Sequence, residues 1–104
     1  MRDRLLSNWS VPQLLEVLQG YTRCDDGVDL LAFRLSGVVP HRCVYVYLYG
    51  DNPDLIHFDL EDRSAGAEEL DYTVRRGAVQ TREELRTVVR LWLGVVHPAG
   101  PGEE

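Results

Sequence analysis

An unbroken alternation of tyrosine with aliphatic residues over positions 43–49 constrains this chain more than any other feature. Successive side chains of a strand point to opposite faces, so a period of two predicts a strand with one tyrosine face and one aliphatic face. A second alternating segment, 56–61, follows the turn residues 50–54. A slip of one residue would turn every side chain to the wrong face. The two patterns therefore predict an antiparallel hairpin in which Tyr47 faces His57.

Two weaker patterns extend this hairpin. In the segment 28–36 the odd positions from Leu31 onward are apolar, and antiparallel pairing with the tyrosine strand places Arg34 beside Tyr45. A fourth strand is predicted near 69–75. Its apolar positions on one side are Leu70, Tyr72 and Val74. The central part of the chain is therefore expected to form a meandering sheet of three to four strands.

Helix-start signals occur in the sequence both before and after these strands. Ser10, with Gln13 three residues later, forms a capping box before a helix predicted near 11–19. Thr81 opens a second capping box, before a helix predicted over about 82–93. Apolar residues recur at helical spacing in both segments. Each helix is therefore expected to lay one face on the aliphatic side of the sheet.

These elements predict an α+β fold in the order α-β-β-β-β-α. The expected architecture is a two-layer sandwich, with the N-terminal and C-terminal helices packed on one face of an antiparallel sheet. A chain of 104 residues has room for one domain. That domain is predicted to span 1–96, and residues 97–104 have the proline, glycine and acidic composition of a flexible tail.

Composition narrows the compartment and the partners. Seventeen acidic residues against eleven basic ones give a net charge of −6, which argues against nucleic-acid binding. Every basic residue is arginine, a bias that we interpret as the mark of a GC-rich bacterial genome. No apolar run is long enough for a signal peptide or a membrane span. A cytoplasmic protein is therefore expected, with Cys24 and Cys43 as reduced thiols.

The tyrosine side of the predicted sheet is the candidate binding face. Tyrosine and arginine are enriched at the centres of protein interfaces, although tyrosine is also simply a good strand former, and both interpretations stay open. The predicted partner-binding residues are Arg34, Tyr45, Tyr47, Tyr49, His57, Asp59, Glu61 and Asp62.

Charge along the chain is segregated. The segment 50–71 holds eight acidic residues and one arginine, a net −7, whereas 72–96 holds five arginines and two glutamates, a net +3. The acidic segment is expected either to steer a basic partner or to be a solvated edge that resists aggregation. Arg82, Arg86 and Arg90 form a like-charged stripe on the last helix, which is either a solvated face or a docking surface.

Catalytic and metal signals are weak by comparison. His57, opposite Tyr47 and diagonal to Asp59, has the neighbours of a general base, but no nucleophile, phosphate-loop or zinc-protease motif accompanies it. The spacing of His41, Cys43 and Cys24 matches no zinc site. No catalytic residue, cofactor or metal is therefore expected.

In size, acidity and helix–hairpin–helix order the chain resembles small bacterial immunity and antitoxin proteins, which mask the basic active site of a toxin. The resemblance implies a non-catalytic, protein-binding domain that presents an acidic, tyrosine-rich sheet face to a basic partner. The alternative hypothesis is a small enzyme or small-molecule-binding domain that uses His57, Asp59 and Glu61 with Tyr45 and Tyr47. A homodimer that closes the same face against itself is the third hypothesis.

Overall fold

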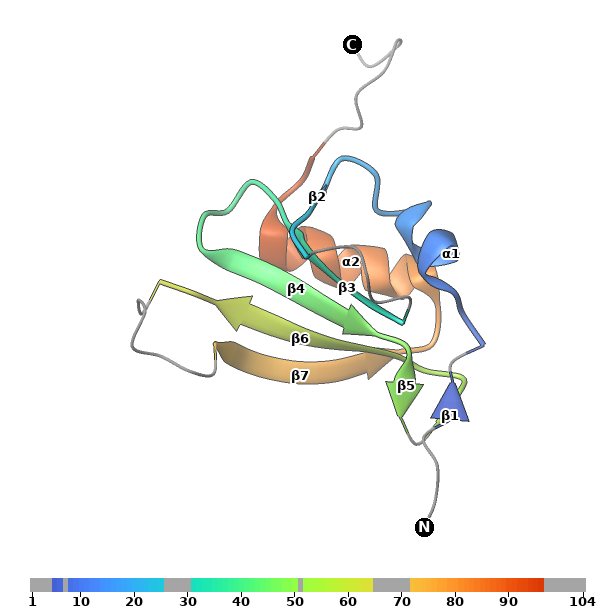
Figure 1. Cartoon of the computed structure of the whole chain (residues 1–104). Helices are drawn as coiled ribbons and strands as arrows, with labels where there is room; N and C mark the ends of the chain where they lie inside the picture. Colours follow the sequence, from blue (N-terminus) through green and yellow to red (C-terminus); the bar gives the residue numbers. More distant parts are fainter. Residues whose placement is uncertain (1–4, 7, 26–30, 51, 65–71, 97–104) are drawn as a thin grey trace, which may run out of the picture.

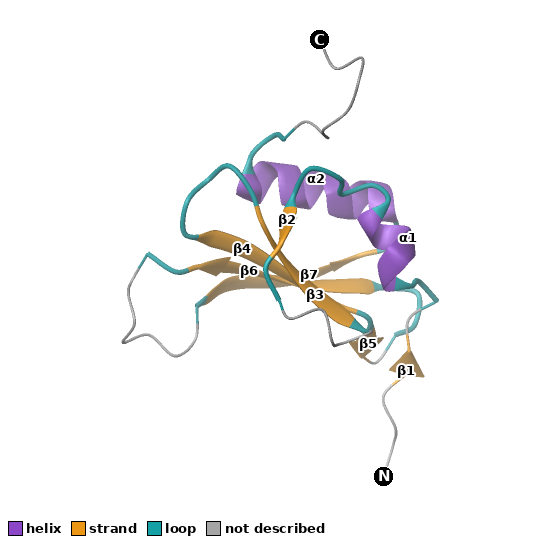
Figure 2. Ribbon diagram, turned by 45° about the horizontal axis from the view of Figure 1, so that its top comes forward, coloured by secondary structure: helices purple, strands orange, loops and turns teal. Residues whose placement is uncertain are grey.

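The computed structural model describes residues 5–6, 8–25, 31–50, 52–64 and 72–96. It is an α+β fold with a five-stranded antiparallel sheet, in the order β2-β3-β4-β6-β7, and both helices lie on one side of that sheet (Figures 1 and 2). In chain order the elements are β1 (Leu5–Leu6), α1 (Val11–Leu15), β2 (Thr22–Arg23), β3 (Ala32–Ser36), β4 (Arg42–Tyr47), β5 (Tyr49–Gly50), β6 (Ile56–Asp62), β7 (Thr73–Val79) and α2 (Arg82–Leu93).

The register of the three central strands confirms the pairing that the alternation predicted. Val46 of β4 faces Phe58 of β6, and Tyr47 faces His57. On the other side of β4, Arg34 of β3 faces Tyr45. The aliphatic side of these strands is buried under the helices, because only one of the two possible registers places every apolar side chain there.

Capping explains where the two helices begin. The hydroxyl of Ser10 accepts a hydrogen bond from the backbone N–H of Gln13, and the side chain of Gln13 accepts one from the N–H of Ser10. Thr81 and Glu84 form the same reciprocal pair before α2. The first helix is shorter than predicted. It ends at Leu15 and is followed by turns, whereas a helix near 11–19 was expected.

The core lies between the sheet and the two helices. Its central members include Phe33, Val46 and Ile56 from the sheet and Leu14 and Val89 from the helices, all of them fully buried. The rest of the buried cluster is Val11, Leu18, Leu35, Val44, Leu48, Phe58, Leu85 and Leu93. No helix in the described residues is long and apolar enough to span a membrane.

The fourth strand of the predicted sheet is displaced along the sequence. The prediction placed it near 69–75, but β7 runs over Thr73–Val79, and positions 69–71, with Leu70, lie outside the described residues. Val74, expected to share an apolar side with Tyr72, is 63% exposed at an irregularity opposite Leu60 and Glu61 of β6. The predicted strand ended too early, because a glycine such as Gly77 usually indicates the end of a strand in the sequence.

Gly77 has a packing function inside β7. It faces Phe58, and a Cβ atom at this position would lie 2.6 Å from the Cζ atom of that ring. The absence of a side chain therefore makes room for Phe58 between β7 and the core. Glycine in a strand interior often marks such a close approach.

Three two-residue strands were not predicted, since they are too short to show a period. The strand expected over 43–49 ends at Tyr47, and after Leu48 the chain turns into β5, which pairs with β1 rather than continuing beside β6. The predicted strand is therefore two residues longer than the segment paired with β6, which ends at Tyr47 opposite His57. β2 adds a fifth strand beside β3, so the sheet is wider than the three to four strands that the sequence indicated.

Candidate functional site

The tyrosine side of the sheet is the side away from the helices (Figure 2). Arg34, Tyr45, Tyr47, His57 and Asp59 lie together on it, because each pairs across the sheet with another member of the set. Glu61 lies on the same side, opposite Cys43, and Tyr49 joins the row through its ring contact with Tyr47. We call this set of seven residues the tyrosine face.

Asp62 is the one predicted partner-binding residue that does not belong to the tyrosine face. The register places it opposite Arg42, on the side of the sheet that carries α2. Its carboxylate accepts a hydrogen bond from the backbone N–H of Ser64, and hydrogen bonding to Ser64 lowers the pKa of Asp62. Asp62 therefore caps the turn after β6, and strand alternation separates it from Glu61.

An ion pair that spans three strands organises one end of the tyrosine face. The guanidinium of Arg34 donates two parallel hydrogen bonds to the carboxylate of Glu61, at 2.9 Å from Nε and 3.1 Å from Nη2. The same guanidinium lies 4.7 Å from the centre of the Tyr45 ring, on the strand between them. Glu61 is only 7% exposed, and bidentate pairing with arginine is the arrangement that makes such burial of a carboxylate tolerable.

The aromatic rings form a continuous row along β4. The ring centres of Tyr45 and Tyr47 are 5.6 Å apart, and those of Tyr47 and Tyr49 are 5.4 Å apart. The imidazole of His57 stacks on Tyr47 from the neighbouring strand, with ring centres 5.4 Å apart and planes 13° from parallel. Tyr47 is thus the centre of the aromatic row, and these contacts restrict how its ring can move.

Asp59 lies on β6 between Glu61 and His57, where its carboxylate is placed between a phenol and a guanidinium. The hydroxyl of Tyr47 donates a hydrogen bond of 3.2 Å to its carboxylate, and Nε of Arg76 lies 3.5 Å from the same oxygen. Arg76 faces Asp59 across the pairing of β6 with β7. Arg63 approaches Glu61 at 3.7 Å in a similar way from the end of β6.

These pairs change the charge that the face presents. The carboxylate side chains of Asp59 and Glu61 are 13% and 9% exposed, whereas those of Arg76 and Arg63 are 66% and 42% exposed. The sequence singled out the two acids but missed the two arginines that answer them. Correct placement of β7 would have found Arg76, because its register puts that residue opposite Asp59.

The imidazole of His57 is packed against its neighbours, so its Nε2 atom is not accessible to a ligand. Its Nε2 atom is buried and has no hydrogen-bond partner among the residues that the structure describes. Gly50 lies against that atom so closely that a Cβ there would be 2.7 Å from it. A general base needs a nitrogen within hydrogen-bond reach of its substrate, and Nε2 of His57 is closed off on this side.

The two cysteines are free thiols, as predicted. Burial raises the pKa of Cys43, and the nearby Cys24 raises it further, so Cys43 is a poor nucleophile at neutral pH. Within the described part of the chain, no group of three histidine, cysteine, aspartate or glutamate side chains is arranged to hold a metal ion.

No protein-family model matches this chain, and no curated protein or solved structure is significantly similar to it.

The phenol of Tyr47 is expected to titrate above its ordinary pKa of 10.0. Burial raises this pKa most, and the charge of Asp59 and the hydrogen bond to it raise the pKa further, with Arg76 opposing. The unfolded chain loses this proton near pH 10, before the folded chain does. The contribution of Tyr47 to stability is therefore complete below about pH 10 and is lost as pH rises through the folded pKa.

The Asp59→Asn substitution should lower the pKa of Tyr47, because it removes a negative charge from the phenol oxygen. The measurement is the ultraviolet absorbance of tyrosinate against pH, with Tyr47→Phe to assign the signal among the five tyrosines. An unchanged titration of Tyr47 in Asp59→Asn would show that the hydrogen bond between them does not persist in solution.

Proposed function

We propose that this protein is a non-catalytic protein-binding domain and that the tyrosine face is its binding surface. The observation that carries the proposal is a sheet face that no helix of the described residues covers (Figure 2), together with a row of three tyrosines held by ring contacts and a neighbouring ion pair. Side chains already restricted before binding lose less conformational entropy on association. Tyrosine and arginine also dominate binding energy at protein interfaces.

The proposed partner is a protein with a basic surface, such as the active-site region of a toxin masked by an immunity or antitoxin protein. The whole-chain charge of −6 favours association with such a surface. At the face itself, Asp59 and Glu61 already have arginine partners. The binding step would therefore be an exchange, in which basic side chains of the partner displace the exposed Arg76 and Arg63 from the two carboxylates.

The buried position of Nε2 in His57 supports the non-catalytic form of this proposal over the enzyme hypothesis. The imidazole fills the space between the Tyr47 ring and Gly50, so it acts as part of the aromatic surface.

The test is affinity capture from the native cell with the full chain as bait, followed by mass spectrometry of stoichiometric partners. Two substitutions alter the tyrosine face: Tyr47→Ala removes the centre of the row, and Arg76→Glu reverses the most exposed charge. The matched control is Arg75→Glu, which makes the same charge change one residue earlier on β7, on the side of the sheet that carries α2.

We expect a partner that is retained by the wild-type chain and by Arg75→Glu and is lost from Tyr47→Ala. Arg76→Glu should strengthen retention in the same experiment, because it removes the guanidinium that competes for Asp59 and presents a new acid to the basic partner. A partner that stays bound to Tyr47→Ala, or that is lost from Arg76→Glu, would overturn the proposal. So would sedimentation that shows a dimer disrupted by Tyr47→Ala, because the face would then be closed against a second copy.

A further inference from the structure

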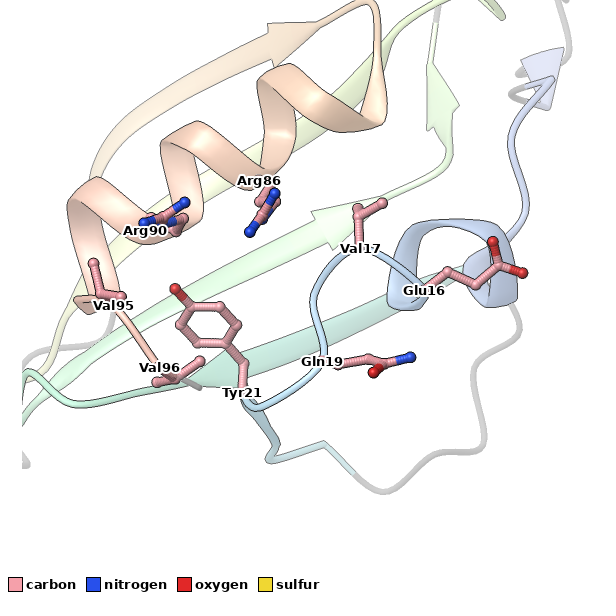
Figure 3. A pocket seen from close by; sticks show the side chains of 8 residues that line it. All are labelled: Glu16, Val17, Gln19, Tyr21, Arg86, Arg90, Val95 and Val96. Carbon is pink, nitrogen blue, oxygen red and sulfur yellow. The ribbon is translucent and has the colours of Figure 1, made fainter. Parts of the chain in front are cut away.

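A hollow of about 410 Å³ lies in the helix layer, between α2 and the segment that joins α1 to β2 (Figure 3). Its size is within the range of small-molecule sites, about 300–1,000 Å³. Arg86 and Arg90 line it from α2, and Tyr21 lines it from the opposite wall. The tyrosine face is on the other side of the sheet, so the two surfaces are separate.

Among the residues that the structure describes, the two arginines in this hollow have no acidic partner. They are one helical turn apart, and like charges at this spacing cost about 0.2–0.5 kcal/mol when nothing answers them. Neither forms an ion pair with any residue in the described ranges, although five other arginines of the protein do. Both side chains are exposed, and they place two cations at one hollow that holds no unpaired anion among the described residues.

The one carboxylate in the lining is already committed elsewhere. Glu16 lies 2.8 Å from Nη1 of Arg82, which also donates a hydrogen bond to the carbonyl of Gln13. Figure 3 shows the carboxylate of Glu16 pointing away from Arg86 and Arg90. The pair of Glu16 with Arg82 is neutral, so the hollow keeps a net charge of +2 from the other two arginines.

Tyr21 fixes the wall opposite these arginines. Its hydroxyl donates a 2.6 Å hydrogen bond to the carbonyl of Gly94, the residue that ends α2. Burial raises the pKa of Tyr21, while Arg90 and Arg86 act in the opposite direction, so both cations are close enough to act on its oxygen. Val17, Val95 and Val96 add an apolar surface beside the charged one.

We propose that this hollow binds the phosphoryl group of a small phosphate monoester, with Arg86 and Arg90 on the phosphoryl oxygens and the valines against the organic part. The planar guanidinium matches phosphate with paired hydrogen bonds. A phosphate monoester carries a charge of about −1.5 to −2 at pH 7, which balances two arginines, whereas a single carboxylate would leave one of them unanswered. This site is independent of the proposed protein-binding function.

The experiment is calorimetric titration of the full chain with phenyl phosphate, in a phosphate-free buffer of low ionic strength. Benzoate, with the same ring and a carboxylate, is the comparison ligand. The variants are Arg86→Gln and Arg90→Gln, alone and together, with Arg75→Gln as the control for loss of one positive charge. Arg75 is exposed and forms no ion pair with a described residue, but it lines a different hollow.

We expect saturable binding of phenyl phosphate that weakens about tenfold or more in each single variant, as for the loss of a charged hydrogen bond, and disappears in the double variant. Arg75→Gln should bind within about twofold of the wild type, since long-range charge effects are screened by salt. Benzoate should bind at least several-fold more weakly. No saturable binding by the wild type, an equal loss in Arg75→Gln, or benzoate binding as tightly as phenyl phosphate would each overturn the proposal.

Discussion

Arg34→Met should lower the free energy of unfolding by about 3 kcal/mol, the range expected when one partner of a buried ion pair is removed. Methionine keeps the aliphatic stem over Tyr45 but leaves the 7%-exposed Glu61 without its bidentate donor. Arg63, with its Nη2 atom at 3.7 Å and its side chain 42% exposed, is too distant to replace two hydrogen bonds. Chemical denaturation of the two proteins measures the difference.

The reciprocal substitution, Glu61→Met, separates the cost of leaving a buried charge unpaired from the loss of attraction between the two charges. Glu61→Met should cost less than Arg34→Met, because Arg34 is 28% exposed and its guanidinium can turn to water. The double variant should be more stable than the sum of the single effects indicates, since neither buried charge then lacks a partner. Arg75→Met is the control and should change stability by no more than about 0.5 kcal/mol. Additive effects of the two substitutions would contradict a coupled pair.

Trp92→Ala should destabilise the protein by about 3–5 kcal/mol, as for other large-to-small changes of packed aromatic residues. Trp92 joins α2 to the sheet at the junction of two strands. Its indole Nε1 donates to the carbonyls of Cys43 and Glu61, both at 3.1 Å, and the guanidinium of Arg42 lies 4.1 Å from the ring centre. Loss of the ring therefore removes packing, a hydrogen bond and a cation–π contact together.

Two further variants divide the effect of Trp92. Trp92→Phe keeps most of the ring but loses the donor, and should cost about 1–2 kcal/mol because two carbonyls lose a partner. Leu91→Ala, one residue earlier on α2 and 79% exposed, should stay within about 0.5 kcal/mol of the wild type. If Trp92→Ala and Leu91→Ala have similar stabilities, the docking of α2 does not depend on Trp92.

The tyrosine face could be predicted from the sequence because strand alternation allows only one register that buries every apolar side chain. Pairing Tyr47 with His57, and Arg34 with Tyr45, follows from strand periodicity once the turn between the strands is recognised. The same reasoning failed for β7, where Gly77 interrupts the pattern, and so the arginine opposite Asp59 was missed. The same alternation puts Asp62 on the opposite side of the sheet from Glu61, as the structure does, although Asp62 was named with the partner-binding residues.

The phosphate site could not be found in this way. Arg86 and Arg90 are visible in the sequence as part of a stripe with Arg82, but all three look equivalent there. Only the folded chain brings Glu16 to Arg82 and leaves the other two facing Tyr21. Whether an arginine of the stripe is paired or available to a ligand therefore depends on a neighbour 66 positions away in the chain, Glu16 for Arg82.

The sequence by itself determined the local and periodic features: the capping boxes of α1 and α2, the strand faces, and the register of β3, β4 and β6. These follow from interactions between residues close in sequence or from a two-residue period that admits one burial pattern. The tertiary structure alone decided which charges are paired. Ion pairs such as that of Arg34 with Glu61 join strands that are not adjacent, so their partners depend on distances set by packing and not by any spacing in the chain.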